Sequence, residues 1–483
     1  MMTMKRWNFF LCVAMVSLSL QAYELPDLGD SSSATLSSKD EMALGRQVMQ
    51  EIRADPSYFN DPESVDFVSS VGDRLLAVSD DLGDQHHFEF FILEDPTLNA
   101  FALPGGFIGV HSGLIEAADN ESELASVLAH EISHVTQHHI ARAMEDQNKN
   151  LPLSLAAMAA AILAARSSPD GAMGGIVGAQ AGMIQAELNN SRENEREADR
   201  LGIRRLLKTD YDPRAMATFF VKLGRYGRFY EGMPASLQTH PLTTERLAEI
   251  QDRLQSIPYR QVQDGPDFAL IQARILALVG SPREAMETFE GKDLDPEHPK
   301  DLPLLYGKAV ALERNGRYAE AKALLDTVRQ KSPPNALFDS LNALIALDSG
   351  HPHQAVSLYL KGLGRYPNQR ALNYGLIRAY LSVHDPERAL TVIGDRLLGS
   401  STDPRLYDYQ SQAYAMQNHQ TMSHEALAHA YLLQDNPTAA MDQLQIALKA
   451  GDGNFYDNSQ AEALLHQVKR ALEERKKGKK GGG

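Results

Sequence analysis

The chain has 483 residues, a length that suggests about two or three domains. It carries 47 Lys and Arg against 63 Asp and Glu, and the net charge of −16 argues against a general nucleic-acid binder. Its single cysteine, Cys12, lies near the N-terminus, so the rest of the chain can form no disulfide.

Residues 1–22 are predicted to be a signal peptide. Lys5 and Arg6 precede the apolar run Phe9–Leu20, and Ala22 is a small residue at the expected cleavage site. An uncleaved anchor is the alternative, but about 12 apolar residues are short for a helix that spans a bilayer. We therefore expect an exported protein.

Two helices are expected between residues 40 and 80, followed by a region of short strands. The strand segments are Phe88–Leu93, Asn99–Leu103 and Phe107–His111. A strand at the edge of a sheet can bind an extended peptide by main-chain hydrogen bonds, so this region is a candidate for substrate alignment.

The next helix contains the sequence His130-Glu131-Ile-Ser-His134. Residues four apart lie on one face of a helix, so both imidazoles can bind one metal ion, and Glu131 can take a proton from a metal-bound water. Zinc held by three protein ligands keeps an open position and lowers the pKa of its water to about 7. The motif predicts peptide hydrolysis. The alternative is a chance match on a solvated helix face, but an apolar stripe on this helix favours a packed element.

Two further histidines, His138 and His139, follow directly. Eight residues of helix span about 12 Å, too far for His138 to share a metal ion with His130. We predict that this pair is a polar helix end.

A third ligand is expected from the helical segment 191–199. Glu195 and Asp199 share one face of this helix, and Glu193 and Glu197 share another. Spacing alone leaves both pairs open, and an ordinary salt-bridged surface is a further alternative. A carboxylate one turn from a ligand suits zinc, because it can orient a ligating imidazole.

The segment Ser191–Asp199, placed after the histidine motif, resembles the zinc metallopeptidases related to the CAAX prenyl protease and the bacterial heat-shock membrane protease. Residues 99–114 and 239–247 match the same family in the same order. The resemblance implies a zincin fold.

The resemblance also implies roles for individual residues. Glu195 would be the third zinc ligand, beside His130 and His134, and Asp199 would orient a ligand. Asn99 and Ala100 would align the substrate. A plain core strand is the alternative for this last segment.

Between the ligand segments, residues 151–187 are rich in Ala, Met and Gly. Each apolar stretch is shorter than a spanning helix requires. We predict a helical hairpin near the active site, mostly buried. A patch that faces a membrane or a client protein is the alternative.

From about residue 265 the sequence changes to helix pairs with a period of 34 residues. Ala321, Ala355 and Ala389 show the period, as do Gly316 and Gly350. The pattern predicts roughly four tetratricopeptide repeats over 265–475, forming a docking domain, with a purely structural role as the alternative. The tail 476–483 is basic and Gly-rich, and is expected to be disordered.

The predicted architecture is therefore an α+β zincin of the gluzincin-like HExxH type over residues 23–260, followed by an all-α tetratricopeptide-repeat solenoid. Together with the leader, the resemblance implies a periplasmic endopeptidase with Zn²⁺ as cofactor. A soluble enzyme and one peripheral to the outer membrane are both left open by the sequence. Its clients would be misassembled outer-membrane β-barrel proteins, and its partner the barrel-assembly machinery, bound through the repeats. The rival hypothesis is a chaperone-like protein with a latent metal site.

His240 has no assigned ligand position. Pro241 disfavours helix at His240, so its side chain is expected to project from a loop or a helix start. It could donate a hydrogen bond to the oxyanion, with Arg246 as a nearby cation. Alternatively it could occupy the open zinc position and keep the protease inactive. A surface histidine that caps a helix is the third reading.

Overall fold

The computed structural model describes residues 37–83, 87–145, 192–229, 240, 243–258, 262, 265–399 and 402–481. The predicted signal peptide (1–22) and the predicted hairpin (151–187) lie outside the described residues. No helix of the described part combines the length and apolar character needed to cross a bilayer.

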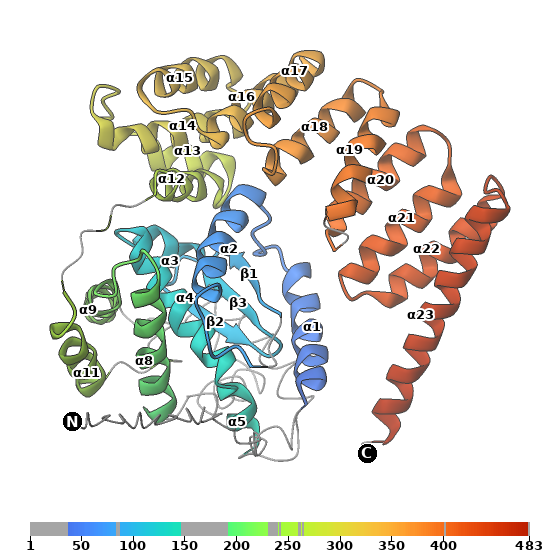
Figure 1. Ribbon diagram of the computed structural model, residues 1–483. Helices are drawn as coiled ribbons and strands as arrows, with labels where there is room; N and C mark the ends of the chain where they lie inside the picture. Colours follow the sequence, from blue (N-terminus) through green and yellow to red (C-terminus); the bar gives the residue numbers. More distant parts are fainter. Residues whose placement is uncertain are drawn as a thin grey trace, which may run out of the picture.

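A three-stranded sheet lies at the centre of the first domain (Figure 1). Its strands are β1 (Glu89–Leu93), β2 (Ala100–Leu103) and β3 (Phe107–His111), in the order β1-β3-β2. The central strand β3 is parallel to β1 and antiparallel to β2. Gly105 and Gly106 form the β2–β3 turn with φ of 79° and 86°, a backbone region that glycine enters without steric cost.

Helices cover both faces of this sheet. The helices of the domain are α1 (Ser38–Ala54), α2 (Pro62–Leu76), α3 (Ser112–Ala117), α4 (Glu121–Thr136), α5 (His139–Glu145), α8 (Arg192–Lys208), α9 (Ala215–Phe229) and α11 (Thr244–Gln255). On one face, α1 packs against Phe91, Phe101 and Phe107. On the other face, α2 and α4 pack against Ile92 and Ile108. The expected two helices and three strands of this region are therefore present.

Helix α4, which carries the histidine motif, is buried along its whole length. Asn120 caps its N-terminus by accepting a hydrogen bond from the backbone of Glu123. Helix α8 packs along α4, and Gly202 lies at their contact, where a Cβ would be 3.4 Å from the backbone of Ala129 and His130. This contact brings the segment that follows residue 191 to the motif.

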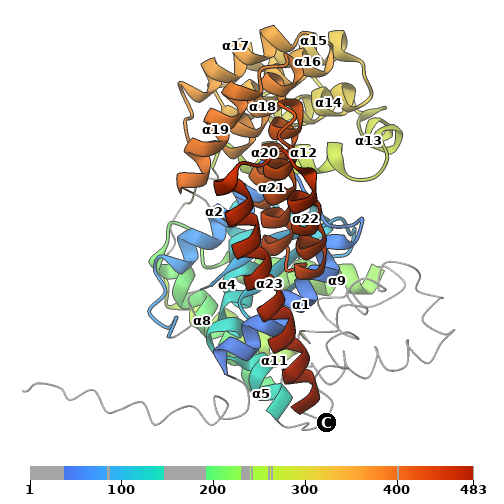
Figure 2. The same ribbon diagram turned by 90° about the vertical axis from the view of Figure 1, so that its right-hand side faces the viewer.

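The second domain is a curved stack of helix pairs that arches over the first (Figures 1 and 2). Its helices are α12 (Phe268–Leu278), α13 (Pro282–Phe289), α14 (Leu302–Arg314), α15 (Tyr318–Lys331), α16 (Ala336–Asp348), α17 (Pro352–Leu363), α18 (Arg370–Ser382), α19 (Pro386–Gly399), α20 (Pro404–Met416), α21 (Gln420–Leu433), α22 (Pro437–Ala450) and α23 (Phe455–Gly481), with a short 3-10 turn at Pro299–Asp301. Ala321, Ala355 and Ala389 are fully buried where helices meet.

The expected number of roughly four repeats is too low, because the described residues contain six helix pairs. Four of the turns within these pairs place one residue at positive φ, at a spacing of 34: Gly316, Gly350, His384 and Asn418. The α18–α19 and α20–α21 turns therefore lack the glycine although the backbone conformation persists.

The tail also differs from expectation, because α23 continues to Gly481. Lys, Arg and Glu are good helix formers, so the basic composition of this segment is compatible with a helix.

The two domains share an apolar core and a buried ionic contact. Helix α2 packs against α12 and α18, and one core cluster runs from Phe59 to Ile345. Arg274 of α12 pairs with Asp61 at 2.7 Å and with Glu63 at 2.5 Å, and it also donates to the hydroxyl of Tyr306. Burial raises the pKa of Glu63 to about 7 although Arg274 opposes this shift.

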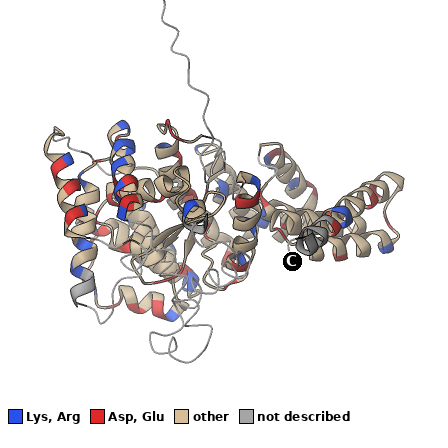
Figure 3. Cartoon of the chain, turned by 90° about the horizontal axis from the view of Figure 1, so that it is seen from below, with Lys and Arg blue, Asp and Glu red and all other residues tan. Residues whose placement is uncertain are grey.

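On the outer helices, acidic and basic residues are interspersed (Figure 3).

Replacing Arg274 by alanine should lower the free energy of unfolding by about 3–5 kcal/mol, because Asp61 and Glu63 would stay buried without their cation. Urea unfolding followed by circular dichroism measures this loss. Arg283→Ala is the control, since the Arg283 side chain is 88% exposed and pairs with Glu287 on the surface. Equal stability of the two variants would show that the buried cluster contributes no net stability.

Candidate metal centre

Four side chains converge beside α4: His130, His134, Glu195 and His240. One potential ligand atom from each lies within 4.8 Å of all the others. The Nε2 atoms of His130 and His134 are 3.0 Å apart, and each lies 3.5 Å from an oxygen of Glu195. His240 reaches the same carboxylate, with Nδ1 2.9 Å from Oε1. Two imidazoles and a carboxylate are the ligands that a zinc site of the catalytic type uses, so the residues fit such an ion.

Packing of the elements explains this convergence. Helix α4 supplies both motif histidines and Glu131, whereas α8 supplies Glu195. These side chains are at most 5% exposed, so their polar groups depend on one another rather than on solvent. The pair Glu195 and Asp199 therefore faces the motif, while Glu193 is exposed at the start of α8.

A carboxylate and a guanidinium contact this cluster from neighbouring positions. Asp199 Oδ1 lies 3.0 Å from Nδ1 of His130. Arg246 of α11 donates from Nε and Nη2 to the two oxygens of Asp199, each at 2.8 Å, and its Nη1 lies 2.7 Å from Glu195 Oε2. The structure thus brings the expected orienting carboxylate to His130. It places Arg246 on the two carboxylates, where a buried cation balances their charge.

Similarity to known proteins identifies the family. Residues 66–254 match the profile of peptidase family M48. The chain is 34% identical over 456 residues to the beta-barrel assembly-enhancing protease of Escherichia coli O157:H7, which covers 93% of this chain and 92% of that protein. A putative beta-barrel assembly-enhancing protease of Vibrio cholerae is 35% identical over 334 residues, or 68% of this chain and 69% of that protein. The mitochondrial metalloendopeptidase OMA1 of Arabidopsis thaliana is 32% identical over 183 residues, or 37% of this chain and 35% of that protein.

The chain belongs to peptidase family M48. It is therefore a metal-dependent protease, and its similarity to the barrel assembly-enhancing members of the family extends through the repeat domain.

The buried charges of this M48 site favour a cation among the histidines. Burial lowers the pKa of His130, but hydrogen bonds to Asp199 and Glu195 outweigh burial and raise it to about 10. Burial raises the pKa of Glu195, yet His240 and the motif histidines hold it well below its usual range. The carboxylates therefore stabilise positive charge beside them, in the form of a proton or a metal ion.

His139 is a part of the M48 site that the sequence pattern did not reveal. We expected it at a polar helix end, but its side chain is fully buried and its Nδ1 lies 2.8 Å from Nδ1 of His134. The backbone of His138 adopts φ of 50°, which ends α4 and turns the chain back. On a continuous helix, a residue five positions after His134 would lie away from its face. No spacing rule could therefore find it.

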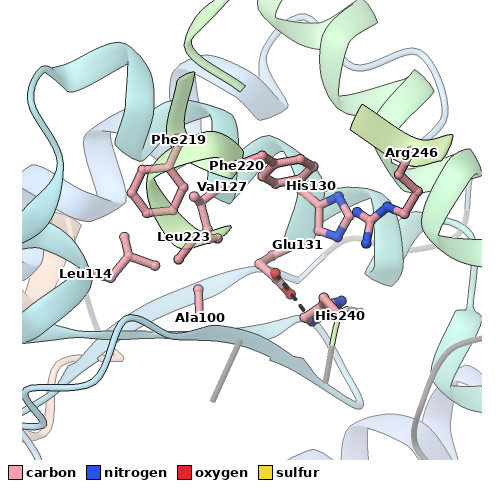
Figure 4. A pocket seen from close by; sticks show the side chains of 10 residues that line it. All are labelled: Ala100, Leu114, Val127, His130, Glu131, Phe219, Phe220, Leu223, His240 and Arg246. Carbon is pink, nitrogen blue, oxygen red and sulfur yellow. Dashed lines mark ion pairs between the residues drawn. The ribbon is translucent and has the colours of Figure 1, made fainter. Parts of the chain in front are cut away.

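An apolar pocket adjoins the motif (Figure 4). Its apolar walls come from β2, α3, α4 and α9, and consist of Ala100, Leu114, Val127, Phe219, Phe220 and Leu223. Glu131 and His240 stand at one side of this pocket, with His240 Nε2 3.7 Å from Glu131 Oε1. The other oxygen of Glu131, Oε2, is buried and has no hydrogen-bond partner among the described residues.

The structure places the two substrate-aligning candidates beside this pocket. Ala100 lines it directly, at the start of a strand on the outer side of the described sheet. Asn99 is 8% exposed, and its side-chain Oδ1 has no hydrogen-bond partner within the described part of the chain.

The arrangement of α8 predicts which carboxylate controls metal binding. Glu195→Gln should reduce metal affinity at least about tenfold, since even residues that only orient a ligand change affinity by 10–100-fold. Glu193→Gln removes the same charge from an exposed position and should leave metal content near wild type. Metal analysis of the two purified proteins compares them. Retention of metal by Glu195→Gln, or its loss from Glu193→Gln, would contradict the assignment.

Proposed function

We propose that this M48 protease is a zinc endopeptidase of the periplasm that degrades misassembled outer-membrane β-barrel proteins and assists the assembly of others. The observation that carries the proposal is the position of Glu131. Its carboxylate lies in the wall of an apolar pocket, beside the cluster of His130, His134 and Glu195, with one oxygen free to accept a proton. The predicted leader supports the periplasmic compartment. The name of the relatives, beta-barrel assembly-enhancing protease, supports β-barrel proteins as clients.

His130, His134 and Glu195 would hold the zinc ion. When bound, zinc polarises the substrate carbonyl and lowers the pKa of water to about 7. Glu131 then accepts the proton of the attacking water and delivers it to the leaving amine, which is the usual double role of a general base in this chemistry. Asp199 fixes the orientation of His130 through their 3.0 Å contact, and Arg246 fixes Asp199.

Substrate alignment is assigned to Asn99 and Ala100. An extended peptide that pairs with β2 would run past the pocket that Ala100 lines, next to Glu131. Main-chain pairing discriminates little between side chains, which suits an enzyme that degrades unfolded segments of many sequences. The buried Oδ1 of Asn99 offers an acceptor for a substrate N–H.

His240 is assigned as a removable fourth ligand that keeps the resting enzyme inactive. The support is its place in the ligand cluster and its 2.9 Å contact with Glu195. A ligand in the open position would exclude the attacking water, and the approach of a client would have to displace it. Donation of a hydrogen bond to the oxyanion is the alternative role of His240.

The repeat domain is assigned to docking. Stacked helix pairs present an extended surface for polypeptides, and this stack arches over the protease domain in Figure 1. We infer that it binds client proteins and the barrel-assembly machinery, with the enzyme peripheral to the outer membrane.

Glu131→Gln should keep zinc and fold but lose peptidase activity by at least about 100-fold, because an amide cannot accept the proton of water. Cleavage of an unfolded β-barrel protein, measured beside zinc content, tests this. Normal cleavage by the zinc-loaded variant would contradict the mechanism. Full complementation by Glu131→Gln at equal expression in cells that lack the protein would instead favour the chaperone-like rival.

His240→Ala should increase cleavage of non-client proteins and of the enzyme itself, because the resting block is removed. Both effects should vanish in the double variant with Glu131→Gln. Time courses with casein and with the purified enzyme alone provide the measurement. If His240→Ala abolishes all cleavage while zinc is retained, His240 donates a hydrogen bond to the oxyanion and does not keep the resting enzyme inactive.

A further inference from the structure

The two motif histidines are oriented by chemically different neighbours. His130 contacts a carboxylate, since its Nδ1 lies 3.0 Å from Asp199. His134 contacts another imidazole, since its Nδ1 lies 2.8 Å from Nδ1 of His139. The ring of His139 stands nearly perpendicular to that of His134, at 76° with 4.7 Å between centroids. A polar ring that is 0% exposed needs partners for both nitrogens, and this one has them.

The second nitrogen of His139 faces a carboxylate. His139 Nε2 lies 3.4 Å from Oε2 of Glu197, and Arg142 and Arg200 hold the two oxygens of Glu197 at 3.3 and 3.4 Å. The groups therefore form a line from Glu197 through His139 to His134. Glu197 follows Glu195 by two residues, about 200° around α8, so one helix serves both the ligand cluster and this line.

Proton positions along this line follow from simple rules. His134 turns Nε2 toward His130 and Glu195, and as a zinc ligand under the proposed function it would offer the lone pair of this nitrogen to the metal ion. A neutral imidazole then carries its proton on Nδ1 and donates it. Nδ1 of His139 must accept that bond, which leaves the proton of His139 on Nε2, where the Glu197 carboxylate accepts it.

We propose that His139 is a positioning residue that fixes the tautomer and the ring orientation of His134, with Glu197 fixing the tautomer of His139 in turn. The proposal rests on the assignment of His134 as a zinc ligand under the proposed function. It explains why the acceptor is an imidazole: three carboxylates, Glu131, Glu195 and Asp199, already lie buried here, and a neutral ring orients His134 without adding a fourth charge. Glu197 keeps its charge farther out, at 27% exposure.

Asparagine and leucine at position 139 separate hydrogen bonding from packing, because their side chains have the same branched shape. The Oδ1 atom of asparagine is bonded to Cγ, as Nδ1 of histidine is, and can accept the proton of His134. Leucine fills the same space and accepts nothing. We expect His139→Leu to weaken zinc binding by about 10–100-fold and His139→Asn to stay within about threefold of wild type.

The measurement is zinc affinity of the full-length apo protein, by competition with a chromophoric chelator. Circular dichroism of the same apo samples confirms that each variant is folded. His138→Asn is the matched control, since it removes the adjacent imidazole while asparagine tolerates the positive φ at that position. It should bind zinc as wild type does.

Wild-type affinity in His139→Leu, or an equal loss in the leucine and asparagine variants, would overturn the proposal and leave His139 a packing residue. If His139→Leu does not fold, ¹⁵N spectra of histidine-labelled, zinc-loaded wild type decide the question. They should show an unprotonated Nδ1 on His139, and a protonated one would overturn the proposal. Zinc binding that depends on His139 in a protein that cleaves nothing would overturn the proposed function alone.

Discussion

The close contact between α8 and α4 is the constraint on which the metal centre depends. The histidine motif and its catalytic carboxylate lie on one helix, whereas Glu195 and Asp199 lie on the other. Gly202 lies at this contact, where a Cβ would meet the methyl group of Met216 at 2.8 Å and the α4 backbone at 3.4 Å. The packing of two helices thus determines the geometry of the ligands.

Charge balance imposes the second constraint. Burial of several carboxylates beside one another is unfavourable unless cations or hydrogen bonds compensate for the lost hydration. Arg246 provides this compensation for both Glu195 and Asp199, and it comes from α11, which the chain reaches only after α9. The ligand cluster therefore depends on α11, the last helix of the protease domain.

The sequence predicted those parts of the site that follow from the spacing of residues within one helix. Four-residue spacing on a helix placed His130 and His134 together, but it left Glu195 and Glu197 equivalent until the family resemblance separated them. His139 lay beyond prediction, because its role depends on a left-handed residue, His138, that no pattern of apolar residues marks. The same limit affected the fold. Gly316 and Gly350 indicated the turns of two repeats, whereas His384 and Asn418 adopt the same backbone conformation without a glycine.

The core that crosses the domain boundary has a consequence for how the molecule unfolds. One apolar cluster includes Phe59 and Val110 of the protease domain and Phe338 and Ile345 of α16, while α17–α20 and α21–α23 are held by separate clusters. A cooperative unit is defined by shared burial rather than by the order of motifs along the chain. The first repeats therefore belong, in energetic terms, to the catalytic half of the protein. The later repeats have cores of their own, and they are joined to the protease domain by the packing of α18 on α2 and by the ion pair between Arg370 and Asp66.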